Sequence, residues 1–467
     1  MKDFSKDYRK KVYVSSDSKD QIEERSTWSS KTAFILAAAA SAVGLGNMWR
    51  FPYLAAKFGG GTFIFTYLIL VFTFGVSLLL LEIALGRKTK LSAIGAFSVY
   101  GKKFTIIGLL ASIVPFIITP YYCIIGGWVI KYMASFVTTP VADLADGGTF
   151  FTNFLYGPTE SYAWMLVFMA ITFLVVALGV KKGIEKANLV MMPALLIMAI
   201  AIAIYVAVQP GAIEGIMYYI VPDFSQFSAD LLLNAMGQMF YSLSLAMGIM
   251  ITYGSYVKKE ECLTSSVSRI AGFDLVVSLI AGFMIVPAAF VVTGGAPTSA
   301  GPSLMFITLP KIFAGMGDAA IVLGFVFFLL VTFAALTSAI SLTETCVSIV
   351  SDGLKWSRRK SFIACVVVIV LVGCFVNAGY NGLSGIRIMG MEILDFFDFI
   401  SNSVIMPIVA LLTCIFVGWI IKPKELIDEI KLSSKFSAEK AWVIIIKFFA
   451  PIFVIAILVW NIIGLLG

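Results

Sequence analysis

The sequence predicts an all-α polytopic membrane protein with about eleven transmembrane helices. Of its 467 residues, 60% are hydrophobic and only 13% are charged, and the mean hydropathy is +0.97. A soluble protein of this length carries about twice that share of charged residues, so the excess apolar surface is expected to face lipid. Long apolar stretches and an alternation of basic loops give the spans and their orientation.

The apolar stretches are long enough to cross a hydrocarbon core of about 30 Å. Their approximate limits are 33–55, 61–86, 105–137, 163–180, 187–208, 229–257, 267–293, 319–352, 361–379, 392–421 and 440–466. Residues 1–31 are polar and hold no apolar segment of the kind found in a signal peptide, so they are expected to form a tail.

Basic residues gather in alternate loops. The loops that follow spans two, four, six, eight and ten are rich in Lys and Arg, whereas loops 138–162, 209–228 and 294–318 hold acidic residues and only Lys311. The positive-inside rule then predicts a multi-pass protein of the cell (inner) membrane with a cytoplasmic N-terminus. The net charge of +7 is therefore attributed to this orientation, and no nucleic-acid partner is expected.

The composition also excludes much catalytic chemistry. The chain contains no histidine, which rules out a Ser-His-Asp or Cys-His nucleophile and a His metal site. Its six cysteines are scattered without a CxxC pair, so they are expected to be buried apolar residues rather than disulfides or metal ligands. We expect neither an enzyme nor an organic cofactor.

Span one carries residues that interrupt a helix. Gly44 and Gly46 lower helix propensity at mid-membrane. Asn47 competes for backbone hydrogen bonds, and Pro52 cannot donate one. Glycines alone would be explained by a kink or a close helix contact, but Asn47 and Arg50 within one turn favour a break that lines a polar cavity enclosed by protein.

Span six shows a related interruption near Ser242, Ser244 and Gly248, where hydroxyls can bond the backbone locally and glycine allows an irregular geometry. Spans one and six would begin the two halves of a five-plus-five inverted repeat, and interruptions at corresponding places indicate a transport site. The expected division is a tail at 1–31, a first repeat at 32–210, a second repeat at 211–422, and a linker with span eleven at 423–467.

Few ionisable residues lie at membrane depth, where such groups are costly and often functional. They are Arg50, Glu82, Asp274, Glu344 and Asp398. Glu82 and Glu344 are expected to bond backbone amides freed by the broken helices, whereas Asp398 could be a solvated group at the start of span ten. Asp274 begins an apolar run that holds no basic residue, so its carboxylate needs a cation.

Span eight contributes two adjacent hydroxyls, Thr337 and Ser338. They could bond back to the preceding carbonyls, or, beside carbonyls released by a broken helix, complete an all-oxygen cage for a hard monovalent cation. The residues thus indicate a cation-coupled transporter with two discontinuous helices, and they do not identify its substrate.

Four motifs resemble the neurotransmitter:sodium symporters. They are Ala42-Val-Gly-Leu-Gly-Asn-x-Trp-Arg-Phe-Pro52, Gly59-Gly-Gly-x-Phe63, Gln238-x-Phe-Tyr-Ser-Leu-Ser244 and Ala334-x-Leu-Thr-Ser338. They occur in this order in a resemblance that runs from Trp28 to about Ile421. The family has the bacterial leucine-transporter fold and imports amino acids or amines with sodium, and eleven spans with a short 138–162 loop are similar to its bacterial branch.

The resemblance implies two sodium ions. The first would be bound by the substrate carboxylate and by Ala42, Asn47, Ser242 and Asp274. The second would be bound by the carbonyls of Ala40, Val43 and Ala334 and by the hydroxyls of Thr337 and Ser338.

The resemblance also implies a substrate site. The carboxylate would meet the Leu45 and Gly46 amides and the Tyr122 hydroxyl, and the amine would meet carbonyls of Ala42, Tyr241, Ser242 and Ser338. The side-chain pocket would consist of Ile118, Tyr241, Ser244, Met247, Ser338 and Leu342. This pocket is largely apolar, and Gly44 stands where amine-specific members carry Asp. A hydrophobic L-amino acid, up to aromatic size, is therefore expected; the alternative is that Met247 fills a leucine-sized space.

Further residues resemble the gates of the family. Arg50 with Asp398 would be the extracellular gate with Tyr241 as its lid, and the cytoplasmic gate would be Arg25 with Asp352, aided by Ser255 and Tyr256. Glu82, Glu344 and Gln238 would have structural roles. The spacing Gly183-x9-Pro193 resembles a span-five element that can unwind and admit water toward the second sodium.

Two positions depart from the family pattern in a way that concerns chloride. Asp274 stands where chloride-dependent members carry Asn, and Ser278 stands where other bacterial members carry Glu. Asp274 would supply the fixed negative charge, so transport is expected to need no chloride.

Alternatives remain for the coupling and for the activity. Asp274 could carry a proton, or the chain could be a ligand-gated channel or an amino-acid sensor without turnover. The absence of histidine favours sodium over protons. A monomer or a homodimer is expected.

Overall fold

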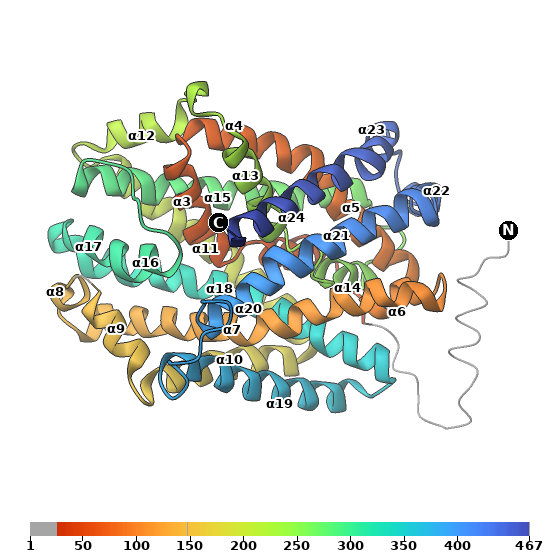
Figure 1. The fold of residues 1–467 in the computed structure, drawn as a ribbon, viewed down its shortest axis with the longest axis horizontal. Coiled ribbons are helices and arrows are strands. Elements are labelled where there is room, and N and C mark those ends of the chain that lie inside the picture. Colours follow the sequence, from red (N-terminus) through yellow and green to blue (C-terminus); the bar gives the residue numbers. More distant parts are fainter. Residues whose placement is uncertain (1–25, 147, 467) are drawn as a thin grey trace.

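The computed structural model describes residues 26–146 and 148–466, and the described part is a bundle of helices (Figure 1). Within it, nine helices are long and apolar enough to cross a membrane, and the bent pair Lys31–Ala42 and Gly46–Lys57 makes a tenth crossing. Two shorter helices, α13 (Ala229–Ser242) and α14 (Ile249–Ser255), occupy the position of predicted span six. The predicted all-α polytopic architecture is confirmed.

The spans follow the chain in the predicted order. They are α2 (Lys31–Ala42) with α3 (Phe51–Lys57), α4 (Gly61–Leu70) with α5 (Val76–Thr89), α7 (Thr105–Thr138), α10 (Glu160–Ala177), α11 (Glu185–Ala207), α13 with α14, α15 (Leu263–Thr293), α18 (Ala320–Leu354), α19 (Arg358–Asn377), α20 (Ile393–Asp398) with α21 (Met406–Ile415), and α23 (Glu439–Ile444) with α24 (Ala450–Leu466). The connections hold α6 (Ala93–Ser98), α8 (Val141–Leu144), α9 (Thr149–Tyr156), α12 (Ala212–Ile220), α16 (Gly301–Ser303), α17 (Leu309–Ala314) and α22 (Lys424–Ile430).

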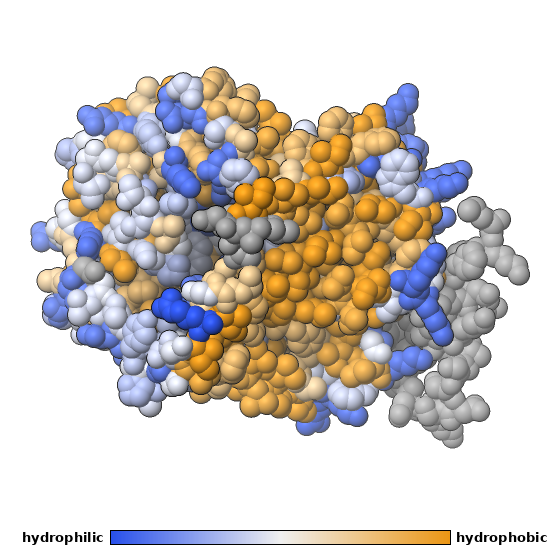
Figure 2. Space-filling model, viewed as in Figure 1, coloured by the Kyte–Doolittle hydropathy of each residue, from blue (hydrophilic) through white to orange (hydrophobic). Residues whose placement is uncertain are grey.

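A belt of hydrophobic residues covers the middle of the molecule, and hydrophilic residues gather toward its two ends (Figure 2). The exposed large apolar side chains include Phe72, Leu174, Leu371 and Ile452. An apolar surface of this extent is excluded from a soluble monomer, so the belt is the surface that faces lipid.

Span five begins earlier than its hydropathy predicts. The helix starts with a π-helical turn at Val180–Ile184 and continues into α11, whereas the sequence predicts a start near residue 187. Lys181, Lys182 and Lys186 lower the local hydropathy but are exposed, so the helix extends past the apolar belt with these side chains in water.

The interrupted spans lie at the centre of the bundle. α2 packs against α11, α15 and α18, and α14 packs against α5. The long helices α7 and α18 pack against each other beside them. This arrangement brings the break of span one next to the break of span six and to the middle of α7 and α18.

Candidate functional site

The helix of span one is interrupted between Ala42 and Gly46, and its two parts meet at 55°. The Gly44 N–H donates to Oδ1 of Asn47 at 2.8 Å. In a continuous helix this N–H would bond the Ala40 carbonyl, so the break releases that oxygen from its usual donor. The Asn47 side chain thus takes a backbone hydrogen bond from the helix, as its residue type predicts.

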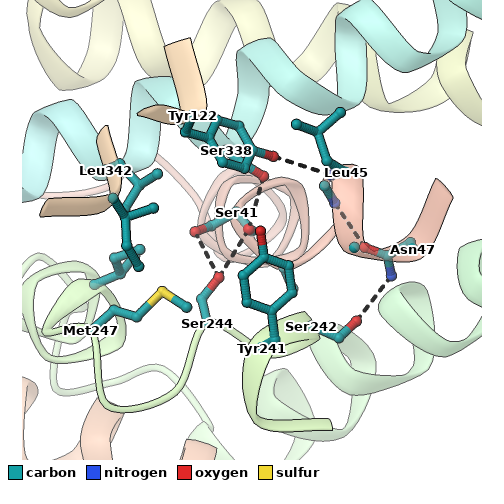
Figure 3. Close-up of a pocket in the computed structure, with 15 residues that line it drawn as sticks. Ser41, Leu45, Asn47, Tyr122, Tyr241, Ser242, Ser244, Met247, Ser338 and Leu342 are labelled. Carbon is teal, nitrogen blue, oxygen red and sulfur yellow. Dashed lines mark hydrogen bonds between the residues drawn. The ribbon is translucent and has the colours of Figure 1, made fainter. Parts of the chain in front are cut away.

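The Leu45 amide also bonds a side chain instead of a helical carbonyl. The Leu45 N–H donates to the hydroxyl of Tyr122 in α7 at 3.1 Å. The Ser41 carbonyl, its partner in a continuous helix, instead accepts from the hydroxyls of Ser244 at 3.0 Å and Ser338 at 3.2 Å (Figure 3). Hydroxyls from three other spans thus replace lost backbone bonds in a region where unpaired groups are costly.

The break between α13 and α14 contains strained backbone, and a side chain of α5 stabilises it. Ser244 and Ala246 have φ of 52° and 61°, the left-handed region that residues other than glycine rarely adopt. The Ala246 N–H donates to Oε1 of Glu82 at 2.7 Å, so a carboxylate bonds an amide freed by the break. Gln238 donates to the Gly46 carbonyl at 3.2 Å and joins the two interrupted spans directly.

The two breaks, α7 and α18 line one cavity. All eleven residues predicted to bind substrate lie in its wall: Ala42, Leu45, Gly46, Ile118, Tyr122, Tyr241, Ser242, Ser244, Met247, Ser338 and Leu342. Ser41 and Ile249 also line it and were not predicted. Ser41 precedes the glycine motif and could have been inferred from it, whereas Ile249 carries no sequence signal of its own.

The cavity has a polar side and an apolar side. In Figure 3, Met247 and Leu342 lie on one side, and the Tyr122 hydroxyl and Asn47 lie on the other. Ser338 and Tyr241 lie between them. This division suits a molecule with a charged head and an apolar side chain.

A buried carboxylate adjoins the polar side. Asp274 Oδ1 accepts from Asn47 Nδ2 and from Ser242 Oγ, both at 2.7 Å, while Oδ2 has no hydrogen-bond partner in the described part of the chain. Ser278 Oγ also accepts from Asn47 Nδ2 at 2.7 Å. An ionised carboxylate is costly to bury without a cation, and carboxylate, amide and hydroxyl oxygens suit a hard ion. The residues predicted for the first sodium therefore fit such an ion.

The residues predicted for the second sodium lie between the end of α2 and α18. The Val43 carbonyl is 3.2 Å from Ser338 Oγ and 3.5 Å from Thr337 Oγ1, and Thr337 donates to the Ala334 carbonyl at 2.9 Å. The released Ala40 carbonyl lies one turn earlier in α2. These uncharged oxygens fit a monovalent hard cation. Thr337 bonds back to a preceding carbonyl of its own helix, as the simpler interpretation predicts, whereas Ser338 bonds the Ser41 and Val43 carbonyls at the break of span one.

The two predicted extracellular-gate residues form no direct ion pair. Asp398 Oδ1 accepts from the Tyr121 hydroxyl at 3.0 Å and from Asn402 Nδ2 at 2.6 Å. Arg50 lines a neighbouring pocket with Tyr241 and Asn402, and within the described ranges it has no carboxylate within 4.0 Å. Tyr121 and Asn402 were not predicted, although Asn402 follows Asp398 by one helical turn and that spacing indicates it.

The cytoplasmic-gate prediction falls partly outside the described residues, because Arg25 lies there. Asp352 Oδ2 accepts from the Ser92 N–H at 2.7 Å, at the start of α6. The Ser255 hydroxyl donates to the Thr252 carbonyl within its own helix.

Glu344 has different partners from those expected. It accepts from the Tyr256 hydroxyl at 2.8 Å and forms an ion pair with Arg358 at 2.6 Å. The sequence predicts a bond to a freed backbone amide, but α18 is continuous around Glu344 and brings it to side chains of α14 and α19 instead. The carboxylate thus joins three helices near the end of the bundle that carries the basic loops.

The chain is similar to known proteins over most of its length. The family model described as the sodium:neurotransmitter symporter family matches residues 25–147 and 157–466. The chain is 34% identical over 449 residues to a sodium-dependent transporter of Bacillus subtilis, YhdH, covering 94% of this chain and 98% of that protein. It is 33% identical over 451 residues to a sodium-dependent transporter of Methanocaldococcus jannaschii, covering 93% of this chain and 90% of that one.

A solved structure is similar over nearly the same length. The crystal structure of MhsT in complex with L-phenylalanine superposes with a TM-score of 0.84 at 36% identity, covering 94% of this chain and all of that one. The interrupted spans and the central cavity therefore belong to a fold that a homologous protein also adopts.

Proposed function

Because this chain belongs to the sodium:neurotransmitter symporter family, we propose that it imports a hydrophobic L-amino acid, up to aromatic size, together with sodium. It is a sodium-dependent transporter that crosses the membrane many times, and not an enzyme. The observation that carries the choice of substrate is the division of the cavity. Amides and hydroxyls gather on one side, where Asp274 is bonded to the lining residues Asn47 and Ser242. The wall also contains the apolar side chains of Ile118, Met247 and Leu342.

The substrate would bind with its carboxylate toward the Leu45 and Gly46 amides and the Tyr122 hydroxyl. The contact between the Leu45 N–H and the Tyr122 hydroxyl, at 3.1 Å, supports this position because it puts both groups side by side in the cavity wall. Backbone amides at the start of a half-helix attract anions. Met247 is unbranched and can change rotamer to admit side chains of different size.

Two sodium ions would be carried with each substrate. The first would bind at Asp274 with Ala42, Asn47, Ser242 and the substrate carboxylate, which makes ion and substrate binding cooperative. The second would bind between Val43 and the hydroxyls of Thr337 and Ser338, with the carbonyls of Ala40 and Ala334. An ionised Asp274 would supply the negative charge at this site, so chloride would not be needed.

The transport cycle would alternate between two accessible states. Sodium would favour the outward-open state, and substrate would complete the first ion site. Arg50 and Asp398 would then close the extracellular gate under Tyr241, and rocking of spans one, two, six and seven would open the side of the basic loops. That side would be the cytoplasm, as the positive-inside rule predicts, and the opening would separate Asp352 from Arg25.

Uptake into proteoliposomes tests this proposal. Radiolabelled phenylalanine should accumulate when external sodium is present and should stop when choline replaces it, even with a proton gradient imposed. Leucine, tyrosine and tryptophan should compete, and gluconate in place of chloride should change nothing. Uptake driven by protons alone, or competition by glycine and alanine only, would contradict the proposal, and sodium-dependent binding without exchange would indicate a sensor.

A further inference from the structure

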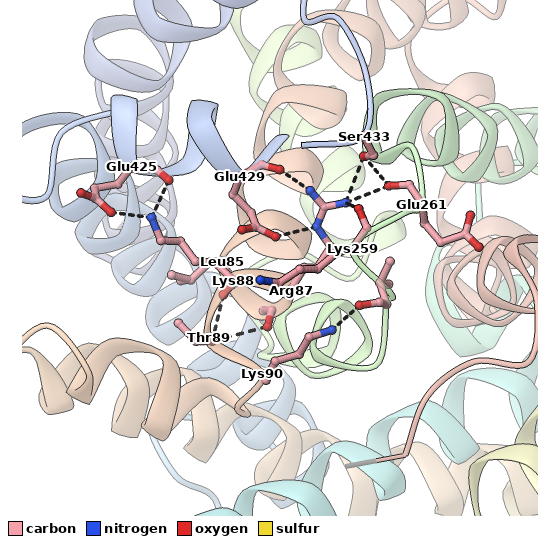
Figure 4. Close-up of polar contacts among 12 residues, drawn as sticks. Leu85, Arg87, Lys88, Thr89, Lys90, Lys259, Glu261, Glu425, Glu429 and Ser433 are labelled. Atoms are coloured by element: carbon pink, nitrogen blue, oxygen red, sulfur yellow. Dashed lines mark hydrogen bonds and ion pairs between the residues drawn. The ribbon is translucent and has the colours of Figure 1, made fainter. Parts of the chain in front are cut away.

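Arg87 is a charged residue buried at the end of α5, and its contacts go to two other segments. Its side chain is 0% exposed. Nε donates to Glu429 Oε1 at 2.8 Å and a terminal nitrogen donates to the Glu429 carbonyl, both in α22 (Figure 4). The other terminal nitrogen donates to the Glu261 carbonyl at 2.7 Å, in the loop after α14, and to Ser433 Oγ at 3.2 Å.

Two neighbouring lysines add contacts of the same kind (Figure 4). Lys88 forms an ion pair with Glu425, one turn before Glu429 on α22, and also donates to its carbonyl. Lys90 donates to the Val257 carbonyl, just after α14. The end of α5 is thus bonded both to α22 and to the segment that follows α14.

The helices α5 and α14 touch through their backbones. A Cβ placed on Gly86 would lie 1.9 Å from the Ile251 carbonyl oxygen, and one placed on Gly254 would lie 2.5 Å from the Ile83 carbonyl oxygen. Such contacts leave no room for side chains between the two helices. α5 and α14 therefore cannot shift toward each other, and Arg87 ties their common end to α22.

Span ten runs from α22, which is bonded to α5, to the neighbourhood of α7. α22 follows α21 after a π-helical turn at Phe416–Ile420, and a second π-helical stretch at Phe399–Ile405 precedes α21. Next to that stretch, Asp398 is bonded to Tyr121 of α7. π-helical turns interrupt the regular ladder of helical bonds and are frequent at functional sites. Span ten thus has an irregular turn at each end, one near α22 and one near α7.

We propose that Arg87 is a positioning residue that joins α5, α14 and α22 into one rigid unit, so that movement of the inner parts of spans two and six is passed to span ten. The proposal rests on the alternating-access function proposed above. The buried pair with Glu429 is the effective link, because a buried guanidinium that loses its carboxylate is strongly destabilised. The Lys88–Glu425 pair is partly exposed, with Glu425 at 40%, and exposed pairs contribute little.

Two neutralising variants of α22 test the link. Glu429→Gln should lower the maximal uptake rate at least tenfold, while the KM for phenylalanine and the amount of sodium-dependent binding stay within twofold. Glu425→Gln is the matched control, one turn away on the same helix, and should change the maximal rate by less than twofold. Equal effects of the two variants, or a loss of binding sites that accounts for the whole loss of rate in Glu429→Gln, would overturn the proposal.

A cross-link separates a mechanical role from a structural one. Lys88→Cys and Glu425→Cys are combined in a chain in which Cys262 and Cys374 are replaced by serine, and are joined with a short bis-maleimide. The cross-link should leave uptake unchanged and should restore at least half of the rate lost in Glu429→Gln. Loss of uptake on cross-linking would show that α22 must separate from α5, and failure to restore the rate would show that the link is not mechanical; either result overturns the proposal.

A measurement without substrate keeps this inference independent of the proposed function. Spin labels on the exposed Lys259→Cys and Lys424→Cys report the distance between the α14 loop and α22 in the same cysteine background. Their distance distribution should be narrow and equal with and without sodium, and at least twice as broad in Glu429→Gln. A distribution that is already broad in the parent chain, or that does not change in the variant, would overturn the link. Absence of phenylalanine uptake by the parent chain would contradict only the proposed substrate.

Discussion

Asp274 is the ionisable residue of a cluster in which Asn47 and Ser242 provide neutral oxygens, and when ionised it would add a full negative charge. All three are buried and bonded to one another, and one carboxylate oxygen is left without a donor. The same carboxylate accounts for the expected independence from chloride, because the charge belongs to the chain.

Replacing this charge should weaken sodium binding. Asp274→Asn is expected to raise the sodium concentration for half-maximal uptake at least tenfold, because a contact to a charged group contributes about 1.5–3 kcal/mol and each 1.4 kcal/mol is about a tenfold change. The sodium dependence of phenylalanine uptake measures the effect. Asp395→Asn, at an exposed carboxylate of span ten, is the control and should leave the dependence unchanged. An unaltered sodium dependence in Asp274→Asn would exclude Asp274 as an ion ligand.

Gly44 is small because the cavity wall closes around it. A Cβ there would lie 2.7 Å from Ser338 Oγ and 2.8 Å from the Tyr122 hydroxyl, two groups proposed to meet the substrate. Gly44→Ala is therefore expected to lower phenylalanine affinity at least tenfold, about 1.4 kcal/mol, as measured by equilibrium binding in detergent. Gly272→Ala, at a helical glycine with no heavy atom within 4 Å of the added Cβ, should bind as the parent chain does. Equal affinity of all three proteins would contradict the proposed carboxylate position.

At the scale of elements, the interrupted spans depend on side chains from uninterrupted ones. Glu82 of α5 bonds the Ala246 amide, and Tyr122 of α7 bonds the Leu45 amide. A break in lipid without such partners would leave amides unpaired at a cost of several kcal/mol each. The surrounding helices are thus part of the site, because their side chains accept the hydrogen bonds that the irregular backbone would otherwise lose.

The support from Glu82 can be removed in two steps. Glu82→Gln keeps an oxygen for the Ala246 N–H and should change the free energy of unfolding by less than about 1 kcal/mol. Glu82→Ala leaves that N–H without an acceptor and should cost about 1–3 kcal/mol more. Thermal unfolding in detergent, followed by tryptophan fluorescence, compares the two variants. Equal midpoints for the Gln and Ala variants would show that the hydrogen bond does not stabilise the break.

For the whole molecule, the proposed stoichiometry predicts that transport responds to membrane potential. Two sodium ions with a zwitterion carry two charges inward, which at 100 mV supplies about 4.6 kcal/mol. Imposing that potential, inside negative, with potassium and valinomycin should raise the accumulation ratio of phenylalanine about 2,000-fold when ion gradients are otherwise equal. A rise of about 45-fold would indicate one net charge per cycle, and no response would contradict electrogenic import.

Much of the architecture is determined by the sequence alone. Membrane crossing follows from the composition and from the apolar stretches, because transfer into lipid depends mainly on each segment's own residues. The break in span one is likewise local: Gly44 and Asn47 weaken the helix wherever it packs. The predicted start of span five, near residue 187, is too late, because Lys181 and Lys182 lower the hydropathy of a helix that continues into water.

The partners of the polar groups were decided only by the tertiary structure. The sequence identified Glu344 as a buried carboxylate but assigned it a backbone amide, whereas helix packing pairs it with Arg358 and Tyr256. Arg87 directly follows predicted span two, in one of the basic loops that the orientation rests on, yet it is buried against Glu429, 342 residues along the chain. Hydropathy and helix propensity depend on neighbours within a few turns, while the partner of a buried charge depends on which distant helices pack around it.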